Sequence, residues 1–432
     1  MSPPAPGQPL SFGRAHLAAS GALKAARRAS VGLASLEVVG DLRRFEPEIR
    51  SMTLLATAPA ATHGEVLQAF QALPFVVRAR VLGGPALHVT LERGEFVLHL
   101  ASLEHGGTAM VWHTGSAGHL ELLRAKARDR ELKLEEGRLS TGAGVAVECP
   151  SEQEFYRRLD LPFIPPELRN GDDEVERAKR NALPNLVADR HIRGDLHMHT
   201  DWSDGRDTLE QMILAADDLR YEYVAITDHS QGSPASRTLS LDGIARQRED
   251  IDRLRRRLPS IEILHGVEVD ILPDGTLDFP DEVLSGFDIV LASLHVREGQ
   301  DGRQLTERYL NAIRHPLVNV ITHPANRTPG VSAGFDLDFD ALFAAATQAG
   351  TAMEIDGAPA HLDMDGALAR RAVAAGVTVV IDSDCHRADG LERQMRFGVG
   401  TARRGWIEPA SVLNTRGVEA VRAFVARKRA HG

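Results

Sequence analysis

The second part of the chain alternates short apolar runs with stretches of helical spacing. The apolar runs fall at 194–198, 223–227, 261–269, 287–293, 318–322, 351–355 and 377–382. Helical spacing of apolar residues falls at 207–219, 241–257, 303–314, 338–348 and 363–375. Alternation of strands and helices predicts a parallel sheet, and near-continuous apolar strands predict burial on both faces. We therefore expect an α/β fold over 193–432, a distorted (β/α)7 barrel with its helices outside.

The first part of the chain has a mixed pattern. Helical spacing appears at 14–30 and 117–130, and strand-like runs appear at 35–40, 52–57, 75–82, 86–91 and 95–101, the last two resembling a hairpin. Residues 162–192 contain a Pro-Pro pair, a charged stretch and little apolar periodicity, which is typical of a connector. The sequence thus predicts a smaller α+β domain over 1–161, a linker over 162–192 and the barrel after it.

Charge and composition narrow the classes of function. The 432 residues carry a net charge of −10, with 23 basic and 23 acidic side chains in 1–190 and 27 basic against 37 acidic in 191–432. Neither part has the basic balance of a protein held on nucleic acid by charge alone. No apolar run approaches the roughly 18 residues of a membrane span, and the N-terminus has no signal-peptide core. With Cys149 and Cys385 as its only cysteines, the chain cannot build a disulfide framework or a cysteine zinc cluster. We expect a cytoplasmic protein without a membrane partner.

Metal-competent side chains recur where the predicted barrel strands end. In parallel barrels the functional residues gather at the carboxyl ends of the strands. Six of the seven ends carry histidine or carboxylate there: His197, His199 and Asp204, then His229, Glu268, His295, His323, and finally Asp384 and His386. The sixth strand has no obvious ligand, although Glu354 and Asp356 are near its end.

The residue types indicate the chemistry. Imidazole and carboxylate suit Mn²⁺, Zn²⁺ or Fe²⁺, and nine candidates exceed the needs of one ion. We therefore expect two or three divalent ions and hydrolysis of a phosphoester, because closely spaced ions generate a hydroxide and stabilise the leaving oxygen.

Other polar residues near the strand ends have plainer expected roles. Arg327 is a candidate phosphate contact, and the Cys385 side chain should point away from the site. The remaining residues are expected to orient ligands (Asp195, Asp228), to be structural histidines (His265, His361), or to form turns (Asp270, Asp274, Asp278).

These motifs resemble a known family. GDLHMHTDWSDG, AITDHS, GVEVDILPDGTLDFPDEVL, ASLHV, ITHP and DSDCH are similar to the PHP (polymerase and histidinol phosphatase) domain, in the version fused to bacterial family X DNA polymerases. The resemblance spans roughly 191–425. It implies three metals held at the nine positions named above, and a Mn²⁺-dependent 3′–5′ exonuclease and 3′-end phosphoesterase. Relatives with this domain also dephosphorylate histidinol phosphate.

The N-terminal part resembles the palm and thumb of the same polymerases with parts missing. WHTGSAGHLELLRAKARDRELKLEEGRL and FYRRLDLPFIPPELR are similar to the nucleotide-holding segment and its continuation. VVGDLRRFEPEIRSMTLLA keeps Gly40, Arg43 and Arg44, but Ser51 and Thr53 stand where the family has aspartates, and we expect Leu98 at the third aspartate position. Because hydroxyl side chains cannot replace carboxylates around two Mg²⁺ ions, polymerase activity is expected to be lost.

Three functions remain open on this basis. The first is hydrolysis at DNA 3′ ends, with Asp204, His229, His386 and Arg327 as catalytic residues. The second is hydrolysis of a small phosphomonoester, favoured because PANRTPGVSAGF replaces an arginine-rich loop and EIDGAPAHLDM an Asn-rich one. The third is a non-catalytic module that binds nucleic acid or another partner.

Overall fold

The computed structural model describes residues 10–28, 32–92 and 94–430, and the chain divides into two compact units, 1–183 and 184–432. The expected linker, 162–192, is divided between them. Residues 162–183 fold into unit 1, where His119 Nδ1 donates to Glu174 Oε1 across 2.7 Å and both side chains are fully buried. Within the described residues, no helix is both long and apolar enough to cross a membrane.

Unit 1 is built on a five-stranded sheet in the order β2-β4-β7-β6-β5. Its strands are β2 (Ser35–Val39), β4 (Thr53–Thr57), β5 (Val76–Val81), β6 (Ala86–Leu91) and β7 (Gly94–Ala101). β4 and β7 run parallel, and the other neighbours run antiparallel. Each predicted strand of this unit is confirmed to within one residue at either end.

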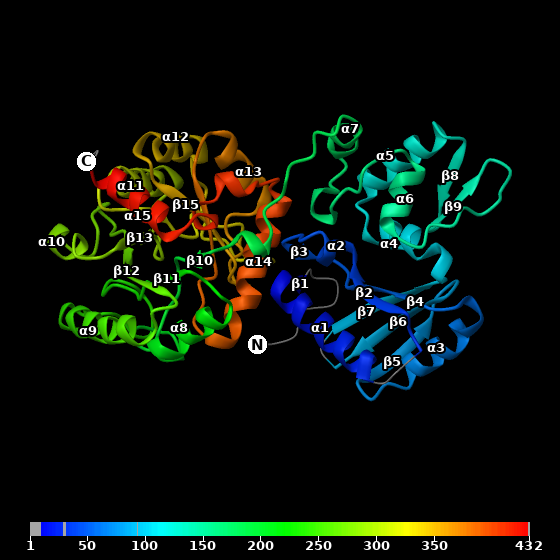
Figure 1. Ribbon diagram of the computed structural model, residues 1–432, viewed down its shortest axis with the longest axis horizontal. Helices are drawn as coiled ribbons and strands as arrows, with labels where there is room; N and C mark the ends of the chain where they lie inside the picture. The colour runs from blue at the N-terminus through cyan, green and yellow to red at the C-terminus, as the bar shows by residue number, and fades with distance from the viewer. Residues whose placement is uncertain (1–9, 29–31, 93, 431–432) are drawn as a thin grey trace. The chain divides into compact units, whose positions relative to one another are not determined.

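Helices and two short strand pairs complete unit 1 (Figure 1). They are α1 (Phe12–Arg28), α2 (Gly40–Arg43), α3 (His63–Gln71), α4 (Gly106–Thr114), α5 (Ala117–Arg128), α6 (Glu152–Arg158) and α7 (Glu174–Lys179), with β1 (Leu10–Ser11) paired to β3 (Glu48–Ile49) and β8 (Leu132–Glu135) to β9 (Arg138–Thr141). Positions 29–30 of the expected helix over 14–30 lie outside the described residues. Ala109 of α4 packs on Val39 and Leu55, so α4 covers one face of the sheet.

Unit 2 contains a parallel seven-stranded sheet whose strands follow chain order, which confirms the predicted α/β barrel. The strands are β10 (Gly194–Asp195), β11 (Tyr223–Ile226), β12 (Glu262–Asp270), β13 (Ile289–Ser293), β14 (Val320–Ile321), β15 (Ala352–Asp356) and β16 (Val379–Asp382). An isolated parallel bridge between Met198 and Cys385, just beyond β10 and β16, joins the first and last strands. The barrel is therefore nearly closed.

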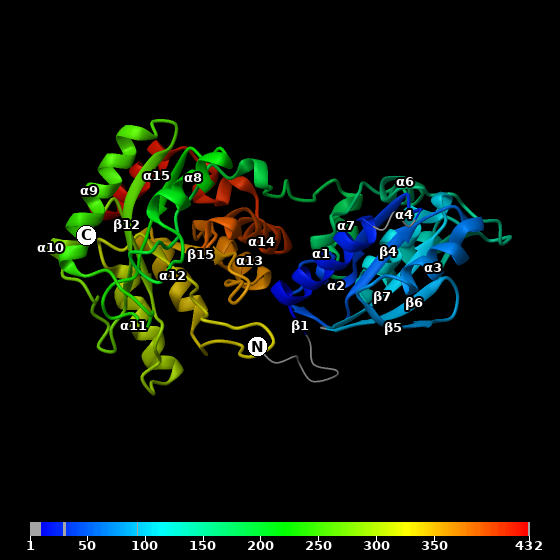
Figure 2. The same cartoon turned by 90° about the horizontal axis from the view of Figure 1, so that it is seen from below.

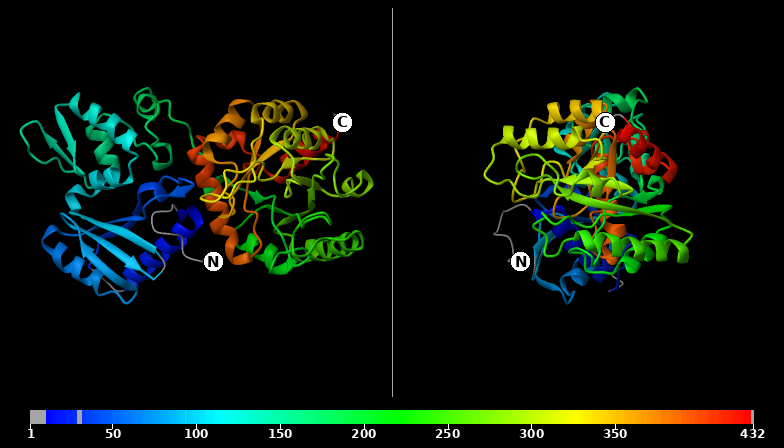
Figure 3. Two further views of the ribbon diagram at one scale, coloured as in Figure 1. Left: turned by 180° about the vertical axis from the view of Figure 1, so that it is seen from behind. Right: turned by 90° about the vertical axis from the view of Figure 1, so that its left-hand side faces the viewer.

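The helices of unit 2 lie outside its strands, as Figures 1, 2 and 3 show from four directions. They are α8 (Leu209–Asp218), α9 (Leu241–Arg257), α10 (Asp281–Leu284), α11 (Gly302–Arg314), α12 (Phe339–Ala349), α13 (Gly366–Ala374), α14 (Leu391–Arg404) and α15 (Val418–Ala430). Polar residues cap their N-termini: the Thr208, Ser240 and Asp301 side chains each accept a backbone N–H of the first turn. These caps fix the βα loops that follow the strands.

Alternate residues of each barrel strand enter two separate cores, as a strand buried on both faces requires. In β11, Tyr223 and Ala225 belong to an inner cluster, whereas Val224 and Ile226 pack toward the helices. The inner cluster also contains Phe424 of α15, which closes the amino-terminal end of the barrel. The carboxyl-terminal end is left for the polar residues described next.

Candidate metal centre

Nine histidine and carboxylate side chains converge at the carboxyl ends of the barrel strands. Three overlapping groups have ligand atoms within 4.8 Å of one another: His199, Asp204, His229 and His386; His197, His199 and Asp384; and His229, Glu268 and His295. His323 lies outside these three groups, but its Nε2 is 2.9 Å from Glu268 Oε1. The structure thus brings together all nine residues that the sequence placed at strand ends.

Glu268, on β12, is the centre of this arrangement. Its Oε2 lies 2.8 Å from His229 Nδ1 and 3.5 Å from His197 Nε2, and its Oε1 faces His323 and His295. It is fully buried because residues 264, 266 and 268 point to the inside of the barrel. With histidines on both oxygens, this carboxylate would help to hold divalent ions at the centre.

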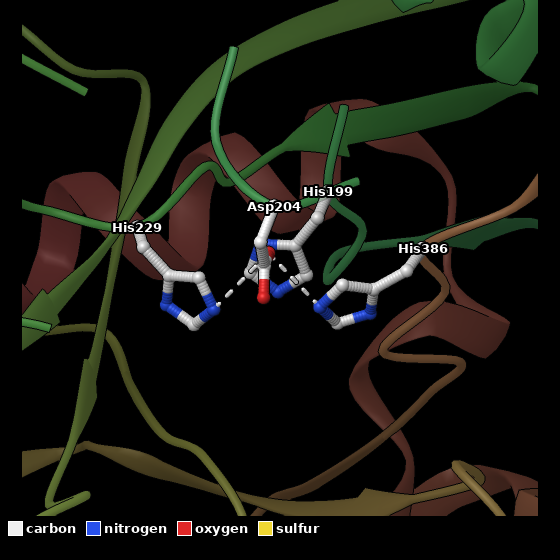
Figure 4. A group of neighbouring side chains, drawn as sticks. All are labelled: His199, Asp204, His229 and His386. Atoms are coloured by element: carbon white, nitrogen blue, oxygen red, sulfur yellow. Dashed lines mark ion pairs between the residues drawn. The ribbon is translucent and has the colours of Figure 1, made fainter. Parts of the chain in front are cut away.

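Asp204 stands between two histidines on the open side of the centre. Figure 4 shows its carboxylate pointing between the rings of His229 and His386, with His199 behind; Oδ1 is 3.6 Å from His229 Nε2 and 3.1 Å from His386 Nε2. The side chains of His386, Asp204 and His295 are 33%, 23% and 19% exposed, whereas the other six are 9% exposed or less. A substrate can therefore approach from the side of these three residues.

The backbone is strained at two of the nine positions. His323 and Asp384 have φ values of 27° and 46°, in the left-handed region that side chains with a Cβ rarely adopt. Such conformations cluster where a side chain must be aimed precisely enough to function. At Asp384 the result is an Oδ1 atom 3.2 Å from His199 Nε2 and 3.7 Å from His197 Nε2.

Two further carboxylates hold the ligands from behind, and both were missed as functional residues in the sequence. Glu354 Oε1 accepts from His197 Nδ1 at 2.6 Å, and its Oε2 accepts from the His323 backbone N–H at 2.7 Å. Asp270, which we expected to form a turn, accepts instead from His295 Nδ1 at 3.0 Å. Such partners fix the tautomer and orientation of a metal-binding imidazole.

Other residues singled out in the sequence are placed as follows. Asp228 accepts from the Thr200 backbone N–H at 2.8 Å and from Ser203 Oγ at 2.5 Å, so it holds the loop that carries Asp204. The Cys385 thiol is buried and donates to a backbone carbonyl, away from the centre. Asp274 forms the expected turn with Thr276.

Arg327 and His361 lie on loops beyond the fifth and sixth strands. Arg327 Nη1 donates to Asp365 Oδ2 at 2.8 Å, which ties its guanidinium to the loop after β15. The His361 ring stacks on His323 with centroids 5.5 Å apart. His361 thus lies beside the proposed ligand His323, and the Arg327 backbone carbonyl lies 3.4 Å from His361 Nδ1.

Charges in the centre compensate one another strongly. Burial alone would lower the pKa of His197, but the neighbouring carboxylates of Glu354, Glu268 and Asp384 raise it well above its ordinary value. Burial and the nearby His229 and His386 lower the pKa of His199 to about 3. The carboxylates therefore favour a positive charge among them. His199 stays neutral, which is the state in which an imidazole binds a metal.

The donor set fits divalent metal ions. Asp204 Oδ1, His229 Nδ1 and Glu268 Oε2 are buried and have no hydrogen-bond partner among the described residues, although other ligand atoms lie within 2.8–3.6 Å of each. Buried polar atoms left without partners cost free energy, and atoms aimed at a common point can be satisfied by a shared cation. The nine residues can hold more than one ion, since Glu268 and Asp204 each face two histidines.

Within the residues that the structure describes, the face of the unit 1 sheet around Thr53 carries no such set. Thr53 lies opposite Val39 on β2 and Val97 on β7, so neither cross-strand neighbour is a carboxylate. The expectation that Leu98 occupies the third aspartate position is wrong. Leu98 pairs with Leu54 and is fully buried on the opposite face, because successive residues of a strand alternate between faces.

Comparisons with known proteins match both units. The PHP domain model matches residues 195–332, and the DNA polymerase beta thumb model matches residues 109–170. The chain is 36% identical over 394 residues to the DNA polymerase/3'-5' exonuclease PolX of Bacillus subtilis (strain 168), a match that covers 90% of this chain and 68% of that protein. It is 29% identical over 233 residues to a probable phosphatase of Thermoanaerobacter sp. (strain X514), covering 51% of this chain and 89% of that protein.

The PolX match runs through both units, and the PHP domain match contains five of the six strand ends that carry candidate ligands, all except that of β16. The resemblance noted in the sequence is therefore confirmed. The chain belongs to the PolX family of PHP-domain proteins, and it is a phosphoester hydrolase.

Proposed function

We propose that the barrel hydrolyses phosphoester bonds at the 3′ ends of DNA, with two or three divalent ions held by the nine residues of the metal centre. The observation that carries this proposal is the convergence of these side chains around Glu268, with buried donor atoms that lack hydrogen-bond partners among the described residues. When bound, ions of this kind supply a hydroxide nucleophile and stabilise charge on the phosphoryl and leaving oxygens.

The residues of the chain position the substrate and move protons. His386 is the most exposed of the nine and faces the open side; if it donates a proton to the leaving oxygen, the ions are held by the other eight residues, whereas His229, the other candidate acid, is nearly buried. Asp204 orients the His386 ring through its contact with Nε2. Arg327, held by Asp365, can contact a phosphate oxygen of the substrate.

We propose further that unit 1 does not polymerise DNA. Phosphoryl transfer to a 3′ hydroxyl needs carboxylates to hold two Mg²⁺ ions, and Thr53 has valines as its cross-strand neighbours. Extension of a primer by the purified protein with Mg²⁺ or Mn²⁺ and nucleotides would contradict this part of the proposal.

A small phosphomonoester is the second candidate substrate. The loop over 324–335 has Arg327 as its one arginine, and Asp365 already neutralises that guanidinium. The loop therefore offers little free positive charge to a DNA backbone. The similarity to probable phosphatases points in the same direction.

One experiment separates these functions. Mn²⁺-loaded protein is given a 5′-end-labelled DNA primer and, in parallel, a panel of small phosphomonoesters. We expect stepwise shortening of the primer and its loss in His197→Ala, because His197 contacts the centre through Nε2 and Glu354 through Nδ1. Turnover of the small esters alone would favour the second candidate. Inactivity on both substrates would favour a binding module, and unchanged activity of His197→Ala would refute the site.

A further inference from the structure

A polar cavity lies at the opposite end of the barrel from the metal centre. It has a volume of about 620 Å³, and its lining includes Arg190, His191, Arg193, Arg220, Glu222 and Arg416. Arg193 directly precedes β10 and Glu222 directly precedes β11, so the cavity lies at the amino ends of the strands. The proposed metal ligands follow the carboxyl ends of the same strands, and the two sites are therefore separate.

Positive charge in this cavity is largely uncompensated. Glu222 is the one carboxylate in its lining, and it pairs with Arg193. Among the described residues, no carboxylate pairs with Arg190, Arg220 or Arg416. Three guanidinium groups thus face one cavity without a counter-charge.

Arginine-rich composition does not account for this grouping. Elsewhere on the barrel, exposed arginines stand beside carboxylates: Arg255 pairs with Asp288, Arg257 with Glu210, and Arg422 with Glu262. The part of the chain that forms the barrel has an excess of acidic residues, so unpaired arginines gathered in one hollow run against its overall charge.

The walls of the cavity are fixed by backbone hydrogen bonds. The Glu222 N–H donates to the Arg193 carbonyl at 2.7 Å, and the Arg193 N–H donates to Asn414 at 2.9 Å. The Tyr223 hydroxyl donates to the carbonyl of Arg416 at 2.9 Å. The bases of these side chains are therefore held in place before any ligand arrives, which lowers the entropic cost of binding.

The positive charge around the cavity also affects the pKa of His191. Burial, together with the charges of Arg190 and Arg403, lowers its pKa. Its Nδ1 accepts the backbone N–H of Ala188 at 3.1 Å, so the remaining ring nitrogen, Nε2, carries the proton. The cavity thus adds a neutral donor to its guanidinium groups.

A neighbouring cavity extends the basic surface. It has a volume of about 420 Å³, shares Arg416 with the first cavity, and is also lined by Arg314, Arg427 and Lys428. None of the described residues that line it is an aspartate or glutamate. The two hollows together can receive more than one anionic group.

We propose that this pair of cavities, joined at Arg416, binds the phosphate groups of a ligand independently of the metal centre. Guanidinium groups present paired N–H donors that match phosphate oxygens, and Arg190, Arg220 and Arg416, which pair with no carboxylate among the described residues, bind them without first breaking an ion pair. The phosphates belong either to a small phosphorylated molecule or to the backbone of a nucleic-acid strand.

The test compares a double variant with a matched control. Arg190→Gln/Arg220→Gln removes two arginines that have no ion pair among the described residues, so the fold should be kept. Arg253→Gln/Arg256→Gln removes the same charge from α9, outside both cavities. Binding of a fluorescent single-stranded oligothymidylate and of inorganic phosphate is measured on the full-length, metal-loaded protein in the His197→Ala background, because an active metal centre is expected to shorten the oligonucleotide. We expect the first variant to bind at least one probe about tenfold more weakly, and the control to bind as the unmodified protein does.

Arginine modification locates the binding. Treatment with phenylglyoxal, followed by mass spectrometry, shows which arginines each probe protects. Protection of Arg190, Arg220 and Arg416 by both probes identifies a small phosphorylated ligand, and protection by the oligonucleotide alone identifies a nucleic-acid backbone. The proposal is overturned if neither probe protects them, or if the double variant and its control bind equally. Because no hydrolysis is measured, failure here leaves the function of the metal centre untouched.

Discussion

Replacing Glu354 by glutamine perturbs the metal centre while all nine proposed ligands stay unchanged. The carboxylate is fully buried and accepts two N–H groups, one from the His197 ring at 2.6 Å and one from the His323 backbone at 2.7 Å. Glutamine has nearly the same shape but a single acceptor oxygen. One of the two buried donors must therefore lose its partner, and the charge that favours proton placement on His197 Nδ1 is removed as well.

The size of the effect follows from these two contacts. A buried donor left unsatisfied costs about 1–3 kcal/mol. Loss of a partner behind a metal-binding histidine typically weakens metal affinity or activity about 10–100-fold. Since about 1.4 kcal/mol corresponds to a tenfold change, the two estimates agree. We expect Glu354→Gln to need about 10–100-fold more Mn²⁺ for half-maximal activity, with the KM for substrate little changed at saturating metal.

The assay is hydrolysis as a function of Mn²⁺ concentration, combined with the metal content of the protein after dialysis. Glu419→Gln is the matched control, because that side chain is 80% exposed on α15 and pairs with Arg422 at the surface. Thermal unfolding of the metal-free variant separates weaker metal binding from a damaged fold. Wild-type metal dependence in a folded Glu354→Gln would refute the positioning role of Glu354.

Three other predictions concern stability and reactivity. Burial lowers the pKa of Lys428 to about 8, below its value in the unfolded chain, so the unfolded state binds more protons between that pH and about 10. The free energy of unfolding should therefore rise over this range. Urea titrations should show that this rise is lost in Lys428→Met, and an equal pH dependence in both proteins would contradict the prediction. Cys149 and Cys385 are buried, so an aromatic disulfide reagent at pH 8 should label the native protein no faster than it unfolds, and rapid labelling would show an accessible thiol. Glu174→Ala leaves the His119 ring and the Gly171 N–H without their acceptor and should destabilise unit 1 by about 1–3 kcal/mol in urea unfolding, whereas Glu176→Ala, at an exposed position, should change little.

The barrel and its nine strand-end residues could be predicted because both follow from local patterns. A strand buried on both faces is apolar along its length, and a parallel sheet brings all carboxyl ends to one rim. His229 and His386 therefore meet at Asp204, although more than 150 residues separate them in the sequence.

Contacts that depend on register or on distant partners could not be predicted in the same way. Placing Leu98 in the third aspartate position failed because a shift of one residue moves every side chain of a strand to the other face. The expected linker looked unstructured because the partner of Glu174 is His119, 55 residues away. The role of Glu354 could have been predicted from the sequence, because it lies within the apolar run 351–355. A carboxylate buried there needs a buried partner, since burying it alone would be very unfavourable.

The two units differ in what their polar residues do for the fold, and this difference supports the assignment of hydrolysis to the barrel. In unit 1, the charged residues that remain near the palm-like segment are satisfied within the protein: Glu152 accepts from Arg43 at 2.9 Å and from the fully buried Arg169 at 2.8 Å. Such a network stabilises the domain whether or not it binds metal.

In unit 2 the opposite holds. Glu268 and Asp204 carry charge beside histidines, and attraction to these histidines offsets only part of the desolvation cost in the metal-free protein. An apolar core could close this end of the barrel at lower cost, as Phe424 does at the other end. Binding of divalent ions would return the free energy that these buried polar groups cost in the metal-free protein. This is the physical reason for assigning the hydrolytic site to the carboxyl-terminal end of the barrel.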